Sequence, residues 1–196
     1  MAYIGGMGGI EMHVIYAADE RGQAEALRLI WEKEEGVIVN FTEKTWCVCG
    51  AERTFREEVC EEAGLLLFHA HHLGGSTVVF PGDLSVMEVR KGPSRFGGAC
   101  VLAACRYLRD KKGLPAWMDG NDLMLWDRDG KTALKVGSHG SGFVGELTQS
   151  VAHFSINMDV ELVGRVCTKP MVKTPGAIGK YGVTAEELWE AVSAEI

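Results

Sequence analysis

The chain has 196 residues and is acidic, with a formal net charge of −7 at pH 7. This charge argues against a general nucleic-acid binder, whose affinity would depend on a basic face. Hydrophobic residues make up 46% of the chain and charged residues 24%, which is typical of a globular protein. No apolar run approaches the ~20 residues of a membrane span, and the start of the chain lacks the features of a signal peptide. We therefore expect a single domain, residues 1–196, located in the cytoplasm and without a nucleic-acid or membrane partner.

The first third of the chain predicts a strand and a helix, then a strand pair and a second helix. The ranges are a strand at 10–17, a helix at 19–33, strands at 37–41 and 45–49, and a helix at 55–63. In the first helix Ala24, Leu27 and Ile30 recur at helical spacing, and Gly36 is the expected stop. The sequence Thr54-Phe-Arg-Glu57 is a capping box, which predicts the start of the second helix.

The middle of the chain predicts two short strands around a glycine pair, followed by the longest helix. The strands cover 65–68 and 78–80, with Gly74-Gly75 between them, and a further strand covers 86–89. A helix is expected from 94 to 111, because six of its residues form one apolar stripe: Phe96, Cys100, Val101, Ala104, Cys105 and Leu108.

The last part of the chain predicts a hairpin, a flexible tether, a strand and a closing helix. The ranges are strands at 120–126 and 131–137 around an Asp-Gly turn at 127–130, a tether at 138–142, a strand at 151–158, a short helix or turn at 159–166, an irregular run at 169–182, and a helix at 184–194. Together these elements predict an α+β fold, with a mixed, mostly antiparallel sheet of seven or more strands and about four helices.

The six cysteines are scattered rather than arranged in pairs with zinc spacing. They are Cys47, Cys49, Cys60, Cys100, Cys105 and Cys167. Several lie inside apolar runs, which indicates reduced, buried thiols. His69 and His71 share one strand face and could supply two zinc ligands, with His72 on the other face, but the sequence offers no obvious third ligand. We therefore predict no metal site built from these residues.

The glycine pair points to a ligand site, because glycines let a backbone come close to a ligand and expose N–H groups to phosphate or carboxylate oxygens. The segment from Gly74 to Val78 resembles the Gly-Gly-Gly-x-Val motif of the biotin/lipoate protein ligase and octanoyl transferase superfamily. Residues 82–85, Gly-Asp-Leu-Ser, resemble its Gly-Asn-Leu motif. The resemblance implies that Gly74, Gly75, Ser76 and Thr77 bind an acyl-adenylate or acyl chain. An ordinary hairpin turn is the competing interpretation.

This chain departs from the family pattern at four positions near the glycines. His71 and His72 lie near where the ligases carry arginines, Leu73 falls where the transferases carry theirs, and Phe80 replaces a histidine. In the acyl-site interpretation, His71 or His72 donates to a phosphate or carboxylate. A histidine makes a weaker contact than a bidentate arginine at neutral pH.

A second motif, Gly120-Asn-Asp-Leu123, is followed by a strand, a turn and a lysine-bearing strand, as in biotin and lipoate ligases. The resemblance implies that Asn121 and Asp122 position ligand or metal, and that a lysine contacts the acyl carbonyl and the phosphate. Lys131 and Lys135 share one strand face, so either could be that lysine. We favour Lys135, because Gly137-Ser138 follows it as a Gly-Ser pair follows the ligase lysine. A solvated strand lysine is the alternative for each.

Two later residues also resemble family positions. His153 lies in a stretch similar to the family's His-Gly strand that runs into Asn-x-Asp, although a core or edge histidine is the alternative. Cys167 lies near where octanoyl transferases carry an acyl-accepting cysteine. A thiolate nucleophile at Cys167 would need a neighbouring base or cation to lower its pKa.

The resemblance as a whole implies a lipoate-protein-ligase-like enzyme that transfers a lipoyl or octanoyl group to a lysine of a lipoyl-type acceptor domain. In that case ATP and Mg²⁺ are the cofactors, lipoate or octanoate is the substrate, and the site holds a small carboxylic acid or its acyl-adenylate. One alternative is an ATP-independent octanoyl transferase that uses Cys167. Another is a member of the same fold that has lost catalysis and binds a small acid or a partner protein.

Overall fold

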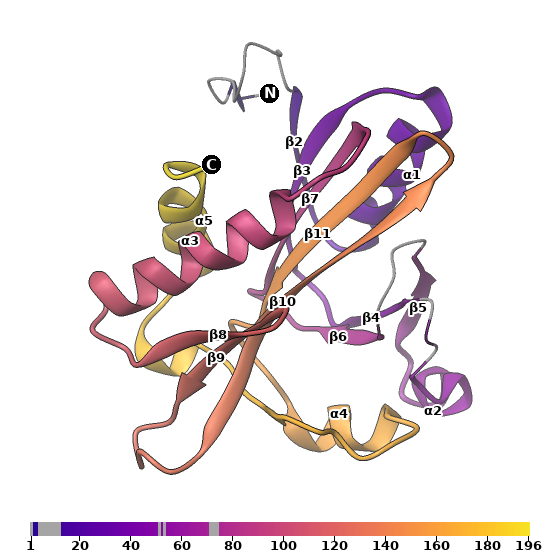
Figure 1. Ribbon diagram of the computed structural model, residues 1–196. Coiled ribbons are helices and arrows are strands. Elements are labelled where there is room, and N and C mark those ends of the chain that lie inside the picture. Colours follow the sequence, from indigo (N-terminus) through magenta and orange to yellow (C-terminus); the bar gives the residue numbers. More distant parts are fainter. Residues whose placement is uncertain (1, 4–12, 51, 53, 71–74) are drawn as a thin grey trace.

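The computed structural model describes residues 2–3, 13–50, 52, 54–70 and 75–196, and shows two sheets of unequal size (Figure 1). The large sheet has nine strands: β1 (Ala2–Tyr3), β2 (His13–Ala17), β3 (Gly36–Phe41), β7 (Leu84–Lys91), β8 (Ala116–Asp119), β9 (Asp122–Trp126), β10 (Ala133–Val144), β11 (Leu147–Phe154) and β12 (Thr174–Pro175). The small sheet has three: β4 (Trp46–Cys49), β5 (Leu66–His69) and β6 (Thr77–Val79).

Most strand pairs are antiparallel, as predicted. The large sheet runs in the order β1-β2-β3-β7-β11-β10-β9-β8, with β12 paired to β10 off this path. Only β2–β3 and β10–β12 are parallel within it. The small sheet has the order β5-β4-β6, with β4 and β5 parallel. The predicted mixed, mostly antiparallel α+β fold is therefore confirmed.

Five α-helices lie in the described residues and cover the two faces of the large sheet differently. They are α1 (Glu20–Glu32), α2 (Glu57–Glu62), α3 (Phe96–Asp110), α4 (Val160–Val166) and α5 (Ala185–Ser193). In Figure 1, α3 and α5 lie on one face, whereas α1, the small sheet and α4 lie on the other. The 3₁₀ helix η1 (Gly179–Tyr181) precedes α5.

The main core lies between the large sheet and the pair α3 and α5. All six residues of the predicted apolar stripe of α3 are buried, with Cys100, Val101, Ala104 and Leu108 at 0% exposure. Val86, Leu123 and Phe154 meet this stripe from three strands of the sheet. Packing against the sheet therefore explains why this helix was the easiest element to predict.

A second core joins the small sheet to α2 and α4. Cys47 and Cys60 belong to it, with their sulfur atoms 3.8 Å apart, as does Phe80. None of the six cysteines, all of which lie in the described residues, forms a disulfide, and only Cys167 is partly exposed. Within the residues that the structure describes, no helix is long and apolar enough to cross a membrane.

Several boundaries differ from those predicted. The expected tether at 138–142 is instead the middle of β10, because β11 pairs with it along its length. Gly36 does not end α1 but begins β3, and Lys33 in the left-handed conformation closes the helix. Thr54 does not cap α2, because its side chain binds the main chain of Ser76.

Candidate functional site

The face of the large sheet turned away from α3 and α5 carries a row of polar residues in β9 to β11. We call this part the open face; α1, the small sheet and α4 lie on the same side of the sheet. In β10, Leu134 and Val136 point into the core, so Lys135 projects from the open face. The same face continues onto β9, because Met124 of β9 is the cross-strand partner of Lys135. A β-bulge between Lys135 and Gly137 shifts the register, so that Gly137 pairs with Leu123 and Ser138 pairs with Asp122.

Lys135 and Asp122 lie at the centre of an ion network on this face. The ammonium of Lys135 is 2.8 Å from Oδ1 of Asp122, and the ammonium of Lys173 is 2.7 Å from Oδ2. Lys173 also contacts Oδ2 of Asp119 at 2.8 Å. Burial of Asp122 would raise its pKa, but the two lysines outweigh that effect and hold the pKa below its usual value. Asp122 is therefore ionised at neutral pH.

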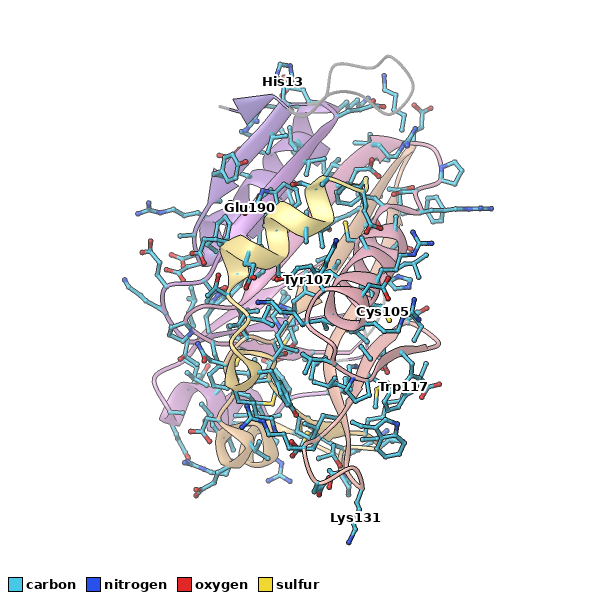
Figure 2. The ribbon with its side chains drawn as sticks, turned by 90° about the vertical axis from the view of Figure 1, so that its left-hand side faces the viewer. His13, Cys105, Tyr107, Trp117, Lys131 and Glu190 are labelled. Atoms are coloured by element: carbon cyan, nitrogen blue, oxygen red, sulfur yellow. The ribbon has the colours of Figure 1, made fainter. Side chains whose placement is uncertain are left out.

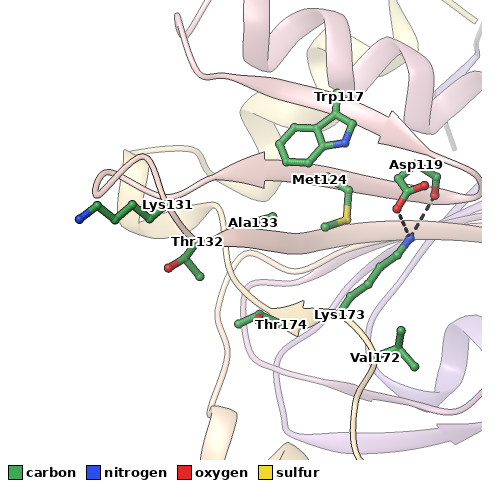
Figure 3. A pocket seen from close by; sticks show the side chains of 9 residues that line it. All are labelled: Trp117, Asp119, Met124, Lys131, Thr132, Ala133, Val172, Lys173 and Thr174. Atoms are coloured by element: carbon green, nitrogen blue, oxygen red, sulfur yellow. Dashed lines mark hydrogen bonds and ion pairs between the residues drawn. The ribbon is translucent and has the colours of Figure 1, made fainter.

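A pocket of about 470 Å³ opens beside this network (Figure 3). Trp117 and Met124 project into it from neighbouring strands, and Lys173 stands at its other side. Because Met124 is the cross-strand neighbour of Lys135, the pocket lies next to that lysine. The full lining is Trp117, Asp119, Met124, Lys131, Thr132, Ala133, Val172, Lys173 and Thr174. An aromatic ring, a thioether, hydroxyl groups and ammonium groups can together hold a polar ligand with an apolar part.

Lys131 differs from Lys135 in its surroundings. It lies in the turn before β10 and is exposed, and Figures 2 and 3 show its side chain pointing out from the molecule. The prediction that Lys131 and Lys135 share one strand face is wrong, because β10 begins at Ala133. Of the two candidate lysines, Lys135 is therefore the one with a partner on the open face.

The glycine turn lies only partly within the described residues, which exclude His71, His72 and Gly74. Gly75 is exposed, and its φ is not in the left-handed region. Ser76 forms two hydrogen bonds with Thr54: its N–H donates to Oγ1 at 2.9 Å, and its hydroxyl accepts the N–H of Thr54 at 3.3 Å. Thr77 is half-buried at the start of β6. These contacts fix the end of the turn against the segment before α2.

Asp83 connects the strand after the glycine turn to the open face. Its side chain is fully buried and accepts N–H groups from Phe80 at 2.9 Å, Ile156 at 2.7 Å and Asn157 at 3.0 Å. These N–H groups favour the charged form, but burial outweighs them and raises the pKa of Asp83 to about 7. The turn that follows β6 is thereby attached to the segment between β11 and α4.

His153 projects from β11 onto the open face between Asp83 and Lys135. Its Nδ1 is 3.0 Å from Oγ of Ser85, and its Nε2 is 3.6 Å from Oδ2 of Asp83 without a hydrogen bond. Burial and, to a smaller extent, the charge of Lys135 lower the pKa of His153 to about 4. His153 is therefore neutral at physiological pH, and it lies near the lysine that the resemblance singles out.

Three other predicted site residues, Asn121, Gly137 and Cys167, are described by their local contacts. Asn121 is exposed in the turn between β8 and β9, and its carbonyl accepts the N–H of His139 at 2.9 Å. Gly137 is needed for packing, since a Cβ there would lie 2.9 Å from the carbonyl oxygen of His153. Cys167 follows α4, and burial raises the pKa of its thiol, with Arg56 opposing. The thiol is therefore protonated at neutral pH.

Sequence reasoning missed Lys173 and the strand β8, which supplies Trp117 and Asp119. Lys173 lies in the run 169–182, for which no regular element was expected, and a two-residue strand leaves no periodic signal. The segment from Asp119 to Asp122 is an Asp-Gly turn between two short apolar runs, residues 116–118 and 123–126. This hairpin signal could have identified β8.

No protein-family model and no curated protein sequence matches this chain. Solved structures do match it. A bipartite lipoate protein ligase from Thermoplasma acidophilum, studied with its E2 lipoyl domain, has a TM-score of 0.68 at 16% identity, over 94% of this chain and 82% of that one. A lipoate-protein ligase A bound with ATP has a TM-score of 0.69 at 15% identity, over 93% and 83%.

A more distant match extends the likeness to biotin ligases. The biotin protein ligase of Leishmania major, in complex with biotinyl-5-AMP, has a TM-score of 0.52 at 12% identity, over 94% of this chain and 72% of that one. The chain has the fold of the biotin and lipoate protein ligases. The resemblance predicted from the glycine and Asn-Asp-Leu motifs is thereby confirmed at the level of the fold.

Proposed function

We propose that this protein is a lipoate-protein-ligase-like enzyme, which transfers a lipoyl or octanoyl group to a lysine of a lipoyl-type acceptor domain. The observation that carries the proposal is the position of Lys135 on the open face. It lies beside a pocket of about 470 Å³, in a chain with the ligase fold. We further propose that residues 1–196 act as one catalytic domain. The cytoplasmic location remains part of the proposal, and buried cysteines without disulfides are typical of a reducing compartment.

In the proposed reaction, the amine of the acceptor lysine attacks the carbonyl carbon of an acyl-adenylate formed from the acid and ATP. A C–N bond forms, the bond from carbon to the phosphate oxygen breaks, and the amine loses a proton to water. Negative charge grows on the carbonyl oxygen and on the leaving phosphate. The ammonium of Lys135 stabilises that charge, since a fixed cation needs no reorganisation during the reaction.

Asp122 keeps Lys135 in place for this role. The side chain of Lys135 is 39% exposed, so a ligand can reach its ammonium, while the 2.8 Å contact with Asp122 limits its rotamers. Neutral His153 nearby adds no positive charge that would compete for the anion. Gly75, Ser76 and Thr77 remain the proposed contacts for the acyl chain or the phosphate, and Asn121 remains a proposed ligand-positioning residue.

Magnesium is also implied by the ATP route. Both oxygens of Asp122 already have a lysine ammonium within 2.8 Å, and in the described part of the chain no group of three or more potential metal ligands gathers. These residues do not fit a magnesium ion held by the protein, and the proposed mechanism uses none.

The test is an acyl-transfer assay with a purified lipoyl domain, read by intact mass of the acceptor. Lipoate or octanoate with ATP is expected to increase the acceptor mass, and Lys135→Met is expected to abolish that increase. Lys131→Met is the matched control, because this lysine points into solvent, and it should leave the rate unchanged. No increase from either acid would refute the ligase proposal.

The same assay separates the alternatives. Transfer from an octanoyl carrier protein without ATP, lost in Cys167→Ser, would identify the octanoyl transferase. Ligand binding without any transfer would identify a non-catalytic member of the fold. The raised pKa of Cys167 favours the ligase over the thiol route, since a protonated thiol is a weak nucleophile.

A further inference from the structure

Main-chain pairing fixes Lys173 close to Lys135. It directly precedes β12, whose residues Thr174 and Pro175 pair in parallel with Leu134 and Lys135. The N–H of Gly176 then donates to the carbonyl of Lys135 at 2.9 Å. A Cβ at position 176 would lie 2.7 Å from the Cβ of Leu134, so only glycine fits there. The segment that carries Lys173 therefore has a defined register against β10.

The two ammonium groups share one carboxylate. Lys135 and Lys173 each bind a different oxygen of Asp122, at 2.8 and 2.7 Å, so both reach the same small region of the open face. Their side chains are 39% and 27% exposed, which leaves both ammonium groups accessible to a ligand. Lys173 also lines the pocket, as Figure 3 shows.

The contacts of Lys173 are not equally strong. Asp122 is 18% exposed, whereas Asp119 is 58% exposed. Asp119 supplies two of the three acceptors of the ammonium, Oδ2 at 2.8 Å and its carbonyl at 3.2 Å. Exposed ion pairs contribute little to stability, so the carboxylate of Asp119 is the contact that an incoming anion can replace.

We propose that Lys173 is a second anion-binding residue of this site, and that Lys135 and Lys173 together hold the phosphate of a phosphorylated ligand. Asp122 keeps the two ammonium groups side by side, and Asp119 occupies the place of the ligand until the phosphate arrives. An ammonium has three N–H donors, so each lysine can contact Asp122 and phosphate together. This inference deepens the proposed function by naming the ligand class, and its test does not need acyl transfer.

The test is calorimetric titration with inorganic pyrophosphate, and separately with AMP, without added metal. Lys173→Met is expected to weaken binding roughly tenfold or more, as for loss of a charged hydrogen bond. Lys173→Arg should keep most of the affinity. Lys111→Met is the control, because this exposed lysine lies at the end of α3 on the opposite face of the sheet, and it is expected to leave binding unchanged.

Asp119→Asn distinguishes an anion site from a purely structural ion pair. If Asp119 competes with the ligand, this variant should bind pyrophosphate about two- to fivefold more tightly, since an exposed pair is removed. If Lys173 only anchors its segment, Asp119→Asn would weaken binding as Lys173→Met does, and the proposal would be overturned. Unchanged affinity in Lys173→Met, or no binding by the wild type, would also overturn it. Failure of acyl transfer alongside normal pyrophosphate binding would count against the ligase proposal only.

Discussion

Asp83→Asn tests the link between the glycine turn and the open face. Oδ1 of an asparagine can still accept the N–H groups of Ile156 and Asn157. Its NH₂ group would face the N–H of Phe80, which loses its acceptor. Leaving one buried donor unpaired costs about 1–3 kcal/mol of unfolding free energy. This part of the cost is independent of pH.

A second, pH-dependent part opposes the first. Burial raises the pKa of Asp83 from 3.8 to about 7, so between these values the folded protein holds a proton that the unfolded chain has released. Stability from this group is therefore greatest at low pH and falls as pH rises. One pKa unit corresponds to about 1.4 kcal/mol, so the wild type loses about 2 kcal/mol between pH 5 and pH 7 through this carboxyl. Asparagine does not titrate and lacks that loss.

Together, the two contributions predict that the difference in unfolding free energy between the variant and the wild type decreases as pH rises. Below pH 4 the variant should be less stable than the wild type by about 1–3 kcal/mol, and between pH 5 and pH 7 the difference should shrink by about 2 kcal/mol. Urea unfolding at pH 5, 6 and 7 measures this, provided that the m-values of the two proteins agree. A gap that stays constant, or widens toward pH 7, would refute the reasoning.

Three further variants test other parts of the structure. His153→Gln should remove a loss of up to about 3 kcal/mol that the wild type shows in urea unfolding as pH falls from 6.5 to 4, because burial depresses the pKa of this histidine to about 4. If the unfolding free energies of His153→Gln and the wild type changed in parallel between pH 6.5 and pH 4, this prediction would be contradicted. Gly176→Ala should cost about 1–3 kcal/mol through its clash with Leu134, whereas Gly164→Ala, on α4 with nothing within 4 Å, should be neutral or stabilising in thermal melts. Cys167→Ser should keep the wild-type rate of acyl transfer, and a large loss of rate would restore the thiol mechanism.

Elements with a strong local signal were predictable from the sequence. The stripe of α3 fixes both its helical state and its buried face. The capping box at Thr184 is confirmed, because its hydroxyl accepts the N–H of Glu187. The hairpin at residues 127–130 is confirmed as well, with Gly130 at φ 64°.

Elements that depend on distant partners were not predictable. Residues 138–142 are rich in glycine and serine, yet they form a strand because β11 supplies a hydrogen-bonding partner for each of them. Thr54-Phe-Arg-Glu57 has the local pattern of a helix start, but Ser76 takes the hydroxyl that would cap it. In both cases a tertiary contact overrides a local preference.

The candidate site shows the same division. The lysine-bearing strand after the Asn-Asp-Leu motif was predictable from the sequence, whereas the contact of Lys135 with Asp122 was not predicted. Lys173 is 51 residues from Asp122, and a two-residue parallel strand brings them together. Such a pairing has no signature in a single sequence. His153 and Asp83 are likewise far apart in the sequence, and no sequence signal predicted that they lie next to each other.

The central claim is that Lys135 stabilises the charge that grows when an activated acid is transferred to an amine. Single-turnover transfer from preformed lipoyl-adenylate to a lipoyl domain tests this step without the activation step. We predict that Lys135→Met slows this transfer by about two orders of magnitude or more, as for loss of one oxyanion-stabilising group, while Lys131→Met matches the wild type. Equal rates for wild type and Lys135→Met would contradict the account.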